Sequence, residues 1–263
     1  MGEAPIDPRA TLELFRHSRV ADGYASARPF LHPEVFARVR DLIRLPGRVP
    51  RALDVGCGTG MSAAALLELA HQVVGIDASA EMLRIARKGD RLRYLASSAE
   101  ALPFRSRSFD LIVACGSIDW VDRARFMPRA ADLLVKGGFL VPLDFGDLGR
   151  SPQVPALGRW YEDVFNLVCP RPPARDPLVT GAEAAPCGFT EPVNHELSSS
   201  CLFTAEKYAD FLMTESNVIA AVEYGGRPPG RLRAWLLAEL GPLFGGEPRA
   251  VAFGGYIQVL RRL

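Results

Sequence analysis

Three closely spaced glycines mark the point where one short apolar run ends and a helix-like segment begins. They are Gly56, Gly58 and Gly60, in the stretch RALDVGCGTGMSAAALLELA. Glycine lets the backbone approach a ligand closely and adopt conformations that a side chain would forbid. A strand-to-helix turn of this kind predicts a binding loop at the carboxyl edge of a parallel sheet, where open α/β proteins hold their ligands.

Residues 51–145 alternate between strand-like and helix-like stretches. We expect strands at RALDV, HQVVGID, RLRYLA, FDLIVACG and GGFLVPLDFG, and helices at MSAAALLELA, SAEMLRIARK and RARFMPRAADLLV. The second helix should begin at Ser79 as its N-cap, and the third should end at Lys136-Gly137-Gly138. This alternation predicts parallel βαβ units with right-handed crossovers, and so an α/β doubly wound fold.

The rest of the chain suggests one domain, residues 1–263, built around the core at 51–145. Residues 1–50 should form an N-terminal cap with helices at 9–21 and 33–45. The proline-rich segment 146–188 and the helical segment 204–245 are expected to form a lid on the acceptor side. The stretch FTEPVNHELSSSCLF and the terminal strand at 248–263 suit an antiparallel edge on a parallel sheet.

Composition excludes several classes of protein. A net charge of +1 argues against a nucleic-acid partner, and no apolar run is long enough to predict a membrane span. The five cysteines contain no C-x-x-C pair, so we expect neither a metal site nor disulfides, in a reduced, cytoplasmic protein. Only three of the 31 basic residues are lysines, which is typical of a GC-rich bacterial genome.

Two acids flank the glycines. A dinucleotide-binding loop would read G-x-G-x-x-G, but here the third glycine comes one residue early and Met61 takes its place. Asp54, just before the glycines, suits a ligand with cationic or hydroxyl groups better than one with phosphates. Asp77 ends the next strand, where a carboxylate can accept hydrogen bonds from both hydroxyls of a ribose.

The motifs ALDVGCGTG, VVGIDAS and SSAEALPFRSRSFDLIVACGSIDW occur in this order and together resemble the class I S-adenosylmethionine-dependent methyltransferases. The chain is most similar to their small-molecule branch, related to ubiquinone-biosynthesis and trans-aconitate methyltransferases. The resemblance implies a Rossmann-like, mostly parallel seven-stranded sheet with an antiparallel edge strand and a helical lid. It also implies methyl transfer from S-adenosylmethionine to an oxygen, nitrogen or carbon of a small acceptor in specialised metabolism, with S-adenosylhomocysteine as product.

By position, the resemblance implies a set of cofactor-binding residues. Those on the methionine side are Gly56, Cys57, Gly58, Gly60, Ala114, Cys115 and Gly116, with Asp54 orienting the loop and Tyr24 and Arg28 capping the carboxylate. Those on the adenosine side are Asp77, Ala78, Met82, Ser98, Ala99 and Glu100.

The chain departs from its relatives at two positions. Ser98 stands where relatives commonly have an aspartate that accepts from the adenine amino group, and a serine hydroxyl reaches less far. Asp119 replaces a frequent histidine, so no histidine base is expected there. Asp119 and Tyr24 are the candidate catalytic residues, although Asp119 also suits a helix cap.

Two other functions remain open at this point. One is a nicotinamide-dependent oxidoreductase on a Rossmann fold, which Met61 disfavours. The other is a protein that keeps the fold and the cofactor but does not methylate.

Overall fold

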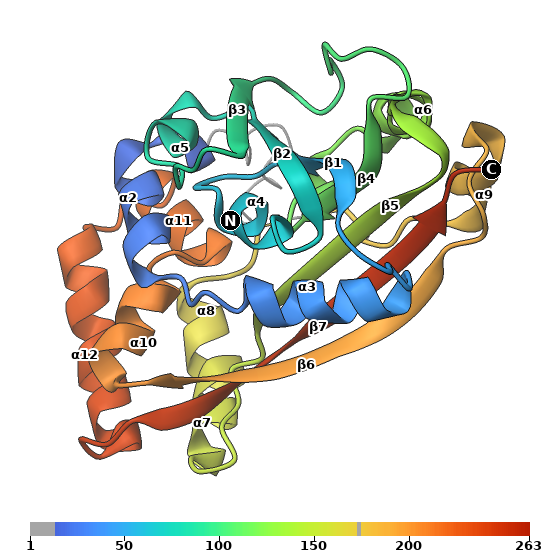
Figure 1. Cartoon of the computed structure of the whole chain (residues 1–263). Helices are drawn as coiled ribbons and strands as arrows, with labels where there is room; N and C mark the ends of the chain where they lie inside the picture. Colours follow the sequence, from blue (N-terminus) through green and yellow to red (C-terminus); the bar gives the residue numbers. More distant parts are fainter. Residues whose placement is uncertain (1–13, 173–174) are drawn as a thin grey trace. The chain divides into compact units, whose positions relative to one another are not determined.

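The structure is a computed structural model that describes residues 14–172 and 175–263. Figure 1 labels its elements along the chain. The strands are β1 (Val49–Val55), β2 (Ala70–Asp77), β3 (Leu92–Ala96), β4 (Phe109–Cys115), β5 (Leu134–Asp147), β6 (Val193–Phe203) and β7 (Arg249–Arg261). The α-helices are α2 (Ser18–Ala27), α3 (His32–Leu42), α4 (Met61–Leu66), α5 (Ala80–Arg84), α6 (Arg123–Leu133), α7 (Pro155–Trp160), α8 (Asn166–Val168), α9 (Gly181–Ala184), α10 (Ala205–Leu212), α11 (Ser216–Glu223) and α12 (Pro229–Phe244). Shorter turns are η1 (Leu14–Arg16), η2 (Ile118–Trp120), η4 (Ala185–Cys187) and the π-helical η3 (Tyr161–Phe165).

The seven strands form one sheet in the order β3-β2-β1-β4-β5-β7-β6. The pairs β1–β2, β1–β4, β2–β3 and β4–β5 are parallel. Strand β7 runs antiparallel to β5, because Arg262 bonds to Gly137 and Gly138 while Ala252 bonds to Leu148. Phe189, which comes shortly before β6, forms an antiparallel bridge with Arg262, which comes directly after β7. Strand β6 lies beside β7 at the edge of the sheet. The predicted fold class, a mostly parallel seven-stranded sheet with an antiparallel edge, is confirmed.

The chain divides into two compact units, which we describe separately. The sheet unit comprises the described residues 30–145, 175–197 and 255–263, and the helical unit comprises 14–29, 146–172 and 198–254. Strands β5, β6 and β7 contribute residues to both units. No helix among the described residues is long and apolar enough to cross a membrane.

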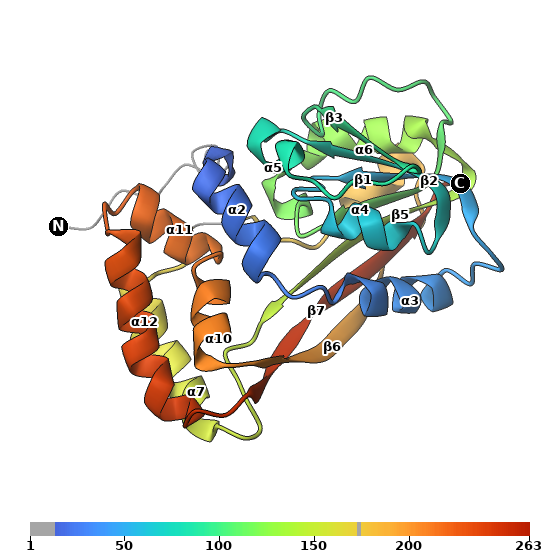
Figure 2. The ribbon, with the colours of Figure 1, turned by 60° about the vertical axis from the view of Figure 1, so that its left-hand side comes forward.

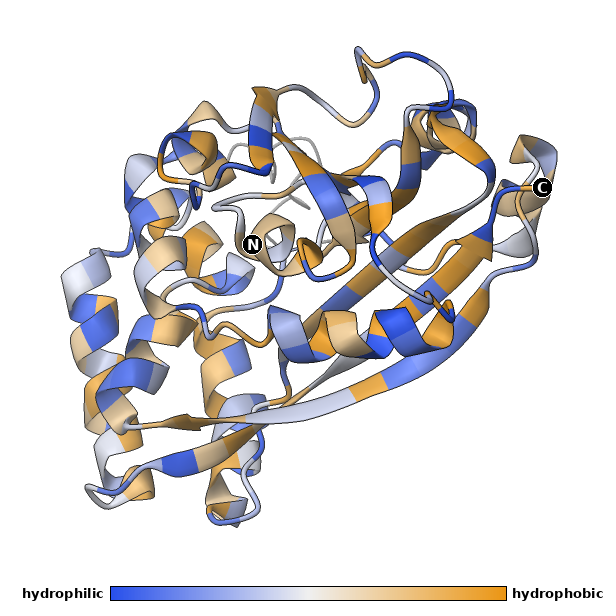
Figure 3. Cartoon of the chain, viewed as in Figure 1, coloured by the Kyte–Doolittle hydropathy of each residue, from blue (hydrophilic) through white to orange (hydrophobic). Residues whose placement is uncertain are grey.

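The sheet unit has a hydrophobic core on each face of the sheet. Successive residues of β4 alternate between the two cores, with Leu111 in one and Ile112 in the other. Helices α3 and α4 cover one core, through side chains such as Phe36 and Leu66. Helix α6 covers the other, with Phe126 fully buried, and Figure 2 shows α4 and α6 on opposite sides of the strands. A strand covered on both faces is expected to be nearly all apolar, as β4 (FDLIVAC) is. In Figure 3 the strands carry hydrophobic segments interrupted by hydrophilic ones.

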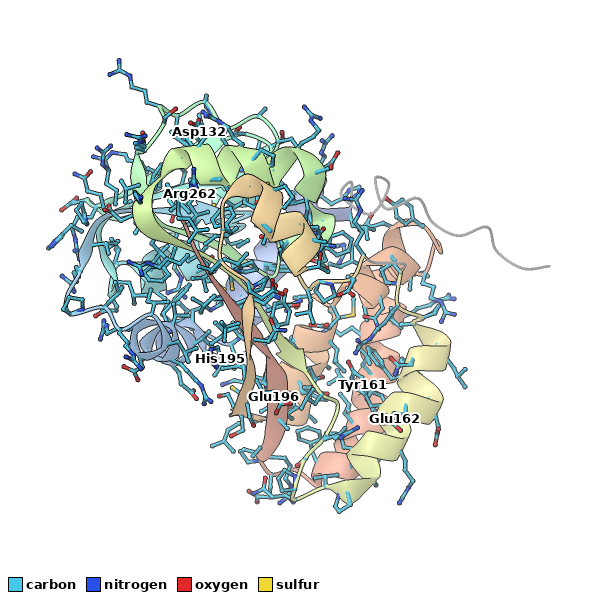
Figure 4. The ribbon with its side chains drawn as sticks, turned by 90° about the vertical axis from the view of Figure 1, so that its right-hand side faces the viewer. Asp132, Tyr161, Glu162, His195, Glu196 and Arg262 are labelled. Atoms are coloured by element: carbon cyan, nitrogen blue, oxygen red, sulfur yellow. The ribbon has the colours of Figure 1, made fainter. Side chains whose placement is uncertain are left out.

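Aromatic rings form the core of the helical unit. Tyr208 and Phe211 of α10 pack against Phe203, Phe244 and Phe253, with ring centroids 5.5 to 6.2 Å apart. In η3 two neighbours face different surroundings, since Tyr161 is buried whereas the side chain of Glu162 is 65% exposed (Figure 4). The buried tyrosines place hydroxyl groups inside an otherwise apolar interior.

The predicted end of the helix before β5 is wrong. Helix α6 ends at Leu133, and Lys136, Gly137 and Gly138 belong to β5. Phe109 pairs with Leu134 but Leu111 pairs with Phe139, so extra residues bulge out of β5 at this point. Gly137 has a φ of 81°, which suits a bulge as well as a helix end. The glycines therefore belong to a bulge in β5 and not to a helix end.

The N-terminal helix also lies later than predicted. In place of one helix over 9–21, the described residues form η1 and then α2, which continues to Ala27. Residues 9–13 of that prediction lie outside the described part of the chain. The predicted helix at 33–45 corresponds to α3.

Candidate functional site

The loop between β1 and α4 has an unusual backbone. Gly56, Gly58 and Gly60 have φ angles of 70°, 51° and 75°, a region that side chains disfavour. Packing also requires glycine at two of them. A Cβ on Gly56 would lie 2.5 Å from Cβ of Ser117, and one on Gly60 would collide with the hydroxyl of Tyr94. The sequence therefore needs glycine here for the backbone and for the neighbouring side chains.

Gly58 differs because a Cβ placed there would meet no atom within 4 Å. The amides around it have partners inside the protein. Those of Gly56 and Cys57 donate to the carbonyl of Ile76 at 2.8 and 2.9 Å, and that of Gly60 donates to the carbonyl of Cys57 at 2.8 Å. A phosphate-binding loop would instead point its amides at the ligand. The loop offers open space and a bare backbone rather than an anion cradle.

Asp77 stands beside this loop at the end of β2. Its Oδ2 accepts a hydrogen bond from the amide of Gly58, and its Oδ1 accepts one from the amide of Ser79, both at 2.8 Å. Burial raises the pKa of Asp77, and the two amide bonds act against that rise. A carboxylate has about four acceptor positions, so both oxygens keep capacity for the hydroxyls of a ribose.

Asp54, the acid before the glycines, is fully buried. The hydroxyl of Ser62 donates to its Oδ2 at 2.6 Å, while Oδ1 has no hydrogen-bond partner among the described residues. Burial raises the pKa of Asp54 to about 7, with the Ser62 bond lowering it and Asp77 adding a smaller rise. A buried carboxylate oxygen without a donor is rare in folded proteins, and a water or ligand group donating to Oδ1 would satisfy it.

Cys57 is buried between these two acids. Burial, then the charges of Asp54 and Asp77, raises the pKa of its thiol well above the ordinary value. The thiol is therefore protonated at neutral pH, as a small apolar wall residue would be.

The residues expected around the adenine differ in exposure. Ala78 and Ser98 are exposed, whereas Met82 and Ala99 are buried. Ser79 caps α5 as predicted, accepting from the amide of Met82 at 3.2 Å. Glu100 has a structural contact, because its Oε1 accepts from the amide of Asp122 at 2.9 Å at the start of α6.

The end of β4 supplies the next predicted group. Ala114 is buried, Cys115 is half-buried and Gly116, with a φ of 62°, is exposed. The hydroxyl of the next residue, Ser117, donates to the carbonyl of Val55 at 2.6 Å. This bond ties the end of β4 to the end of β1, so the two carboxyl ends that frame the glycine loop hold a fixed spacing.

Asp144 lies beside Gly116 and interacts electrostatically, as Asp119 does, with Tyr256. A Cβ on Gly116 would lie 3.1 Å from Oδ1 of Asp144. Burial, then the charges of Asp144 and Asp119, raises the pKa of Tyr256 in β7, whose hydroxyl donates to the carbonyl of Pro177 at 3.1 Å. Burial also raises the pKa of Asp119, which lies in η2 and does not cap α6, since the N-cap there is Asp122. We call Asp119, Asp144 and Tyr256 the acidic cluster.

Tyr24 and Arg28 belong to the helical unit. The Arg28 guanidinium lies 4.5 Å from the centroid of the Tyr24 ring, donates to Oγ1 and the carbonyl oxygen of Thr214 at 2.8 Å, and pairs with Glu215 at 3.0 Å. The expected role of Tyr24 and Arg28 on the cofactor carboxylate stays a prediction, as does a catalytic role for Tyr24.

Several residues of the site were missed from the sequence. Ser62, Ser117, Asp144 and Tyr256 all contribute contacts described above. Asp144 carried a usable signal, because it is the acid near the end of the apolar strand GGFLVPLDFG. The serines gave none, since serine is common in loops and helices. Among the described residues no three His, Cys, Asp or Glu side chains are grouped to hold a metal.

Comparisons with known proteins agree with this geometry. Residues 53–141 match the model of a family described as a methyltransferase domain. Uncharacterized methyltransferases of Mycobacterium bovis and Mycobacterium tuberculosis are 34% identical over 227 residues, covering 86% of this chain and 84% of the relatives. A ubiquinone biosynthesis O-methyltransferase of Chelativorans sp. is 34% identical over 125 residues, covering 41% of this chain and 49% of that protein.

A solved structure shows the same fold. It is a protein of Anaeromyxobacter dehalogenans described as a type II methyltransferase, with a TM-score of 0.64 and 23% identity, covering 84% of this chain and 94% of the other. The relatives that match most of the chain are methyltransferases, as the family model indicates, and the solved structure shares the fold. The chain belongs to the class I S-adenosylmethionine-dependent methyltransferases.

Proposed function

We propose that the chain methylates a small-molecule acceptor at a hydroxyl or amine group, with the acidic cluster on the acceptor side of the reaction. The observation that carries the proposal is that Asp144 lies beside exposed Gly116 at the carboxyl end of β4, with Asp119 in the short turn η2 that follows. A carbon acceptor with no proton to lose would have little use for two carboxylates and a phenol at this place.

The cofactor-binding role rests on the residues of the glycine loop. The open space at Gly58 and the orphaned Oδ1 of Asp54 fit a nucleoside lying against the loop, and Asp77 would hold its ribose hydroxyls. Bound S-adenosylmethionine supplies a sulfonium-activated methyl group. The protein then has to align the acceptor and exclude water, which can contribute on the order of 7–11 kcal/mol in favourable cases.

The acidic cluster would prepare the acceptor. A carboxylate accepts the proton of a hydroxyl, or takes one from an ammonium so that the nitrogen lone pair becomes free. Burial raises the pKa of Asp119, which makes its carboxylate a stronger base than an ordinary aspartate. Arg123 works against that shift, and its Nε pairs with Glu183 at 2.9 Å.

Two further features support a small acceptor. The chain carries a net charge of only +1, unlike proteins that hold long nucleic acids. The relative from Chelativorans is named for ubiquinone biosynthesis, a small-molecule pathway. We also infer that residues 1–263 act as one methyltransferase domain, with the segments 146–188 and 204–245 serving the acceptor.

The test is release of S-adenosylhomocysteine with panels of phenols, alcohols, amines and stabilised carbanions. For any acceptor found, Asp144→Asn and Asp119→Asn should lower kcat by at least about tenfold at neutral pH, and the loss should shrink at low pH, where the native carboxylates are protonated and no longer act as bases. Asp132→Asn, a change at an exposed acid in α6, is the matched control. Turnover only on carbanions, or full kcat in both variants, would contradict the proposal.

A further inference from the structure

The helical unit contains a cavity of about 290 Å³. Its lining comes from the end of α8, the turn before α12 and the first turns of α12 (both helices are labelled in Figure 1). The lining residues are Val168, Arg227, Pro228, Arg231, Leu232 and Trp235. The volume is near the lower end of pockets that hold small organic molecules.

One side of this cavity is apolar and well supported. Leu232 is buried, and Val168 and Trp235 are half-buried. The Trp235 ring packs 6.2 Å from that of Trp160, whose Nε1 donates to Glu239 at 3.0 Å. These contacts hold the indole in place, so its face can receive an apolar ligand without first being ordered.

The wall at α8 is fixed too. The side-chain amide of Asn217 in α11 donates to the carbonyl of Cys169 at 2.9 Å, one residue after Val168. Burial raises the pKa of the Cys169 thiol and the Arg227 charge opposes that rise, which places the guanidinium beside the end of α8.

The other side of the cavity is cationic. Arg227 and Arg231 have no carboxylate partner among the described residues, and the lining contains no acid. Other arginines of the same unit do find acids, as Arg19 does with Glu223 and Arg233 does with Asp210. Arg227 and Arg231 are both exposed.

The start of α12 adds to this positive field. The helix is 16 residues long, and it has no acid in its first turn and no side-chain cap. The N-terminal end of a helix carries a partial positive charge, which acids of the first turn normally offset. Here Pro228, Arg231 and the helix end meet at one cavity, and no negative group of the described chain lies in its lining.

We propose that this cavity binds a small organic anion, a carboxylate or a phosphate ester that carries an apolar ring or chain. Arg227 and Arg231 take the anion, because guanidinium groups match the paired oxygens of both groups. Trp235, Leu232 and Val168 take the apolar part. The site lies wholly within the helical unit and does not depend on the function proposed above.

The test uses the full chain without S-adenosylmethionine, so that its outcome is separate from that of the methylation assay. Binding of 1-naphthoate and 1-naphthyl phosphate is measured by calorimetry and by tryptophan fluorescence, with neutral 1-naphthol and inorganic phosphate as comparison probes. We expect saturable binding of both naphthyl anions and weaker binding of each comparison probe. Whichever anion binds more tightly identifies the head group.

Variants then locate the site. Arg227→Gln with Arg231→Gln should weaken anion binding by at least about tenfold, the loss of roughly one charged hydrogen bond. Arg159→Gln removes one positive charge from an exposed position of α7 and should leave anion binding unchanged. Trp235→Phe should remove most of the fluorescence change while the circular dichroism stays native. No saturable binding at millimolar concentration, equal affinity for 1-naphthol, or unchanged affinity in the double variant would overturn the proposal.

Discussion

The amide of Gly58 donates a hydrogen bond to Oδ2 of Asp77 at 2.8 Å, so the acid that ends β2 holds the loop that follows β1. The other oxygen of the same carboxylate accepts from Ser79, the N-cap of α5. One side chain therefore fixes two segments of the cofactor site. Its removal should affect binding more than a single lost contact would.

Asp77→Ala should abolish S-adenosylmethionine binding measured by calorimetry. Hydrogen bonds to a charged group contribute about 1.5–3 kcal/mol each, so loss of the two expected from the ribose weakens binding by on the order of 10²-fold or more. Asp90→Ala, at an exposed acid of the same unit, is the control and should bind normally. Native affinity in a folded Asp77→Ala variant would remove Asp77 from the site.

Gly58→Val should also abolish binding, for a different reason. The side chain would enter the open space beside the loop and would have to adopt a φ of 51°, which costs about 1–2 kcal/mol. Gly47→Val is the matched control, because a Cβ there also meets nothing within 4 Å but the backbone has no positive φ. Calorimetry and thermal melting separate the two effects. If Gly58→Val lowers stability yet binds the cofactor normally, the space beside Gly58 is not used.

Much of the cofactor-binding part of the site was predictable from the sequence, because the patterns that indicate it lie within short stretches of the chain. Alternating apolar runs predicted the parallel core, and three glycines within five residues predicted the positive φ angles that the loop has. Ser79 was recognisable as an N-cap from its own position before a helix-like segment. In each case the residue and its partner lie close together in the sequence.

The missed residues have distant partners. Ser117 bonds to the carbonyl of Val55, 62 residues earlier, and Tyr256 joins Asp119 and Asp144 only after β7 has entered the sheet beside β5. The bulge at Gly137 was missed because it depends on the register between β4 and β5. Pairings of this kind follow from the assembled sheet and leave no pattern in a single stretch of sequence.

Asp54→Asn should make stability less sensitive to pH. Burial raises the pKa of Asp54 from 3.8 to about 7 in the folded protein, so its stabilising contribution is complete below about pH 4 and is lost as the pH rises through 7. Asparagine stays neutral, and its amide oxygen can still accept from Ser62. Raising the pH from 5 to 8 should therefore lower the free energy of unfolding less in the variant than in the native protein, by a difference of at most about 4 kcal/mol.

Urea denaturation at the two pH values measures this difference. Asp132→Asn, at an exposed acid, should show none. The contribution of Asp147 is the same in the native and variant proteins and cancels. Parallel stability curves for the native protein and Asp54→Asn would show that the Asp54 pKa is not raised.

Tyr208→Phe should destabilise the helical unit, most strongly at high pH. The Tyr208 hydroxyl donates to Oδ2 of Asp147 at 2.5 Å, and the amide of Gly149 donates to Oδ1 at 2.7 Å. Burial raises the pKa of Asp147 to about 7, and the Tyr208 bond acts against that rise. Without the hydroxyl, the ionised carboxylate loses a buried donor, at a cost of about 1–3 kcal/mol.

The pH dependence distinguishes this bond from simple packing. The Tyr208 hydroxyl stabilises the charged carboxylate, so the cost of Tyr208→Phe should be larger at pH 8 than at pH 5, measured by urea denaturation. A double-mutant cycle with Asp147→Asn isolates the pair, because the pH dependence of the Tyr208→Phe effect should vanish once the carboxylate is gone. Since the ring of Tyr208 also packs against Phe211 and Phe244, and phenylalanine keeps that packing, an equal loss at both pH values would mean that Asp147 stays neutral and needs no donor.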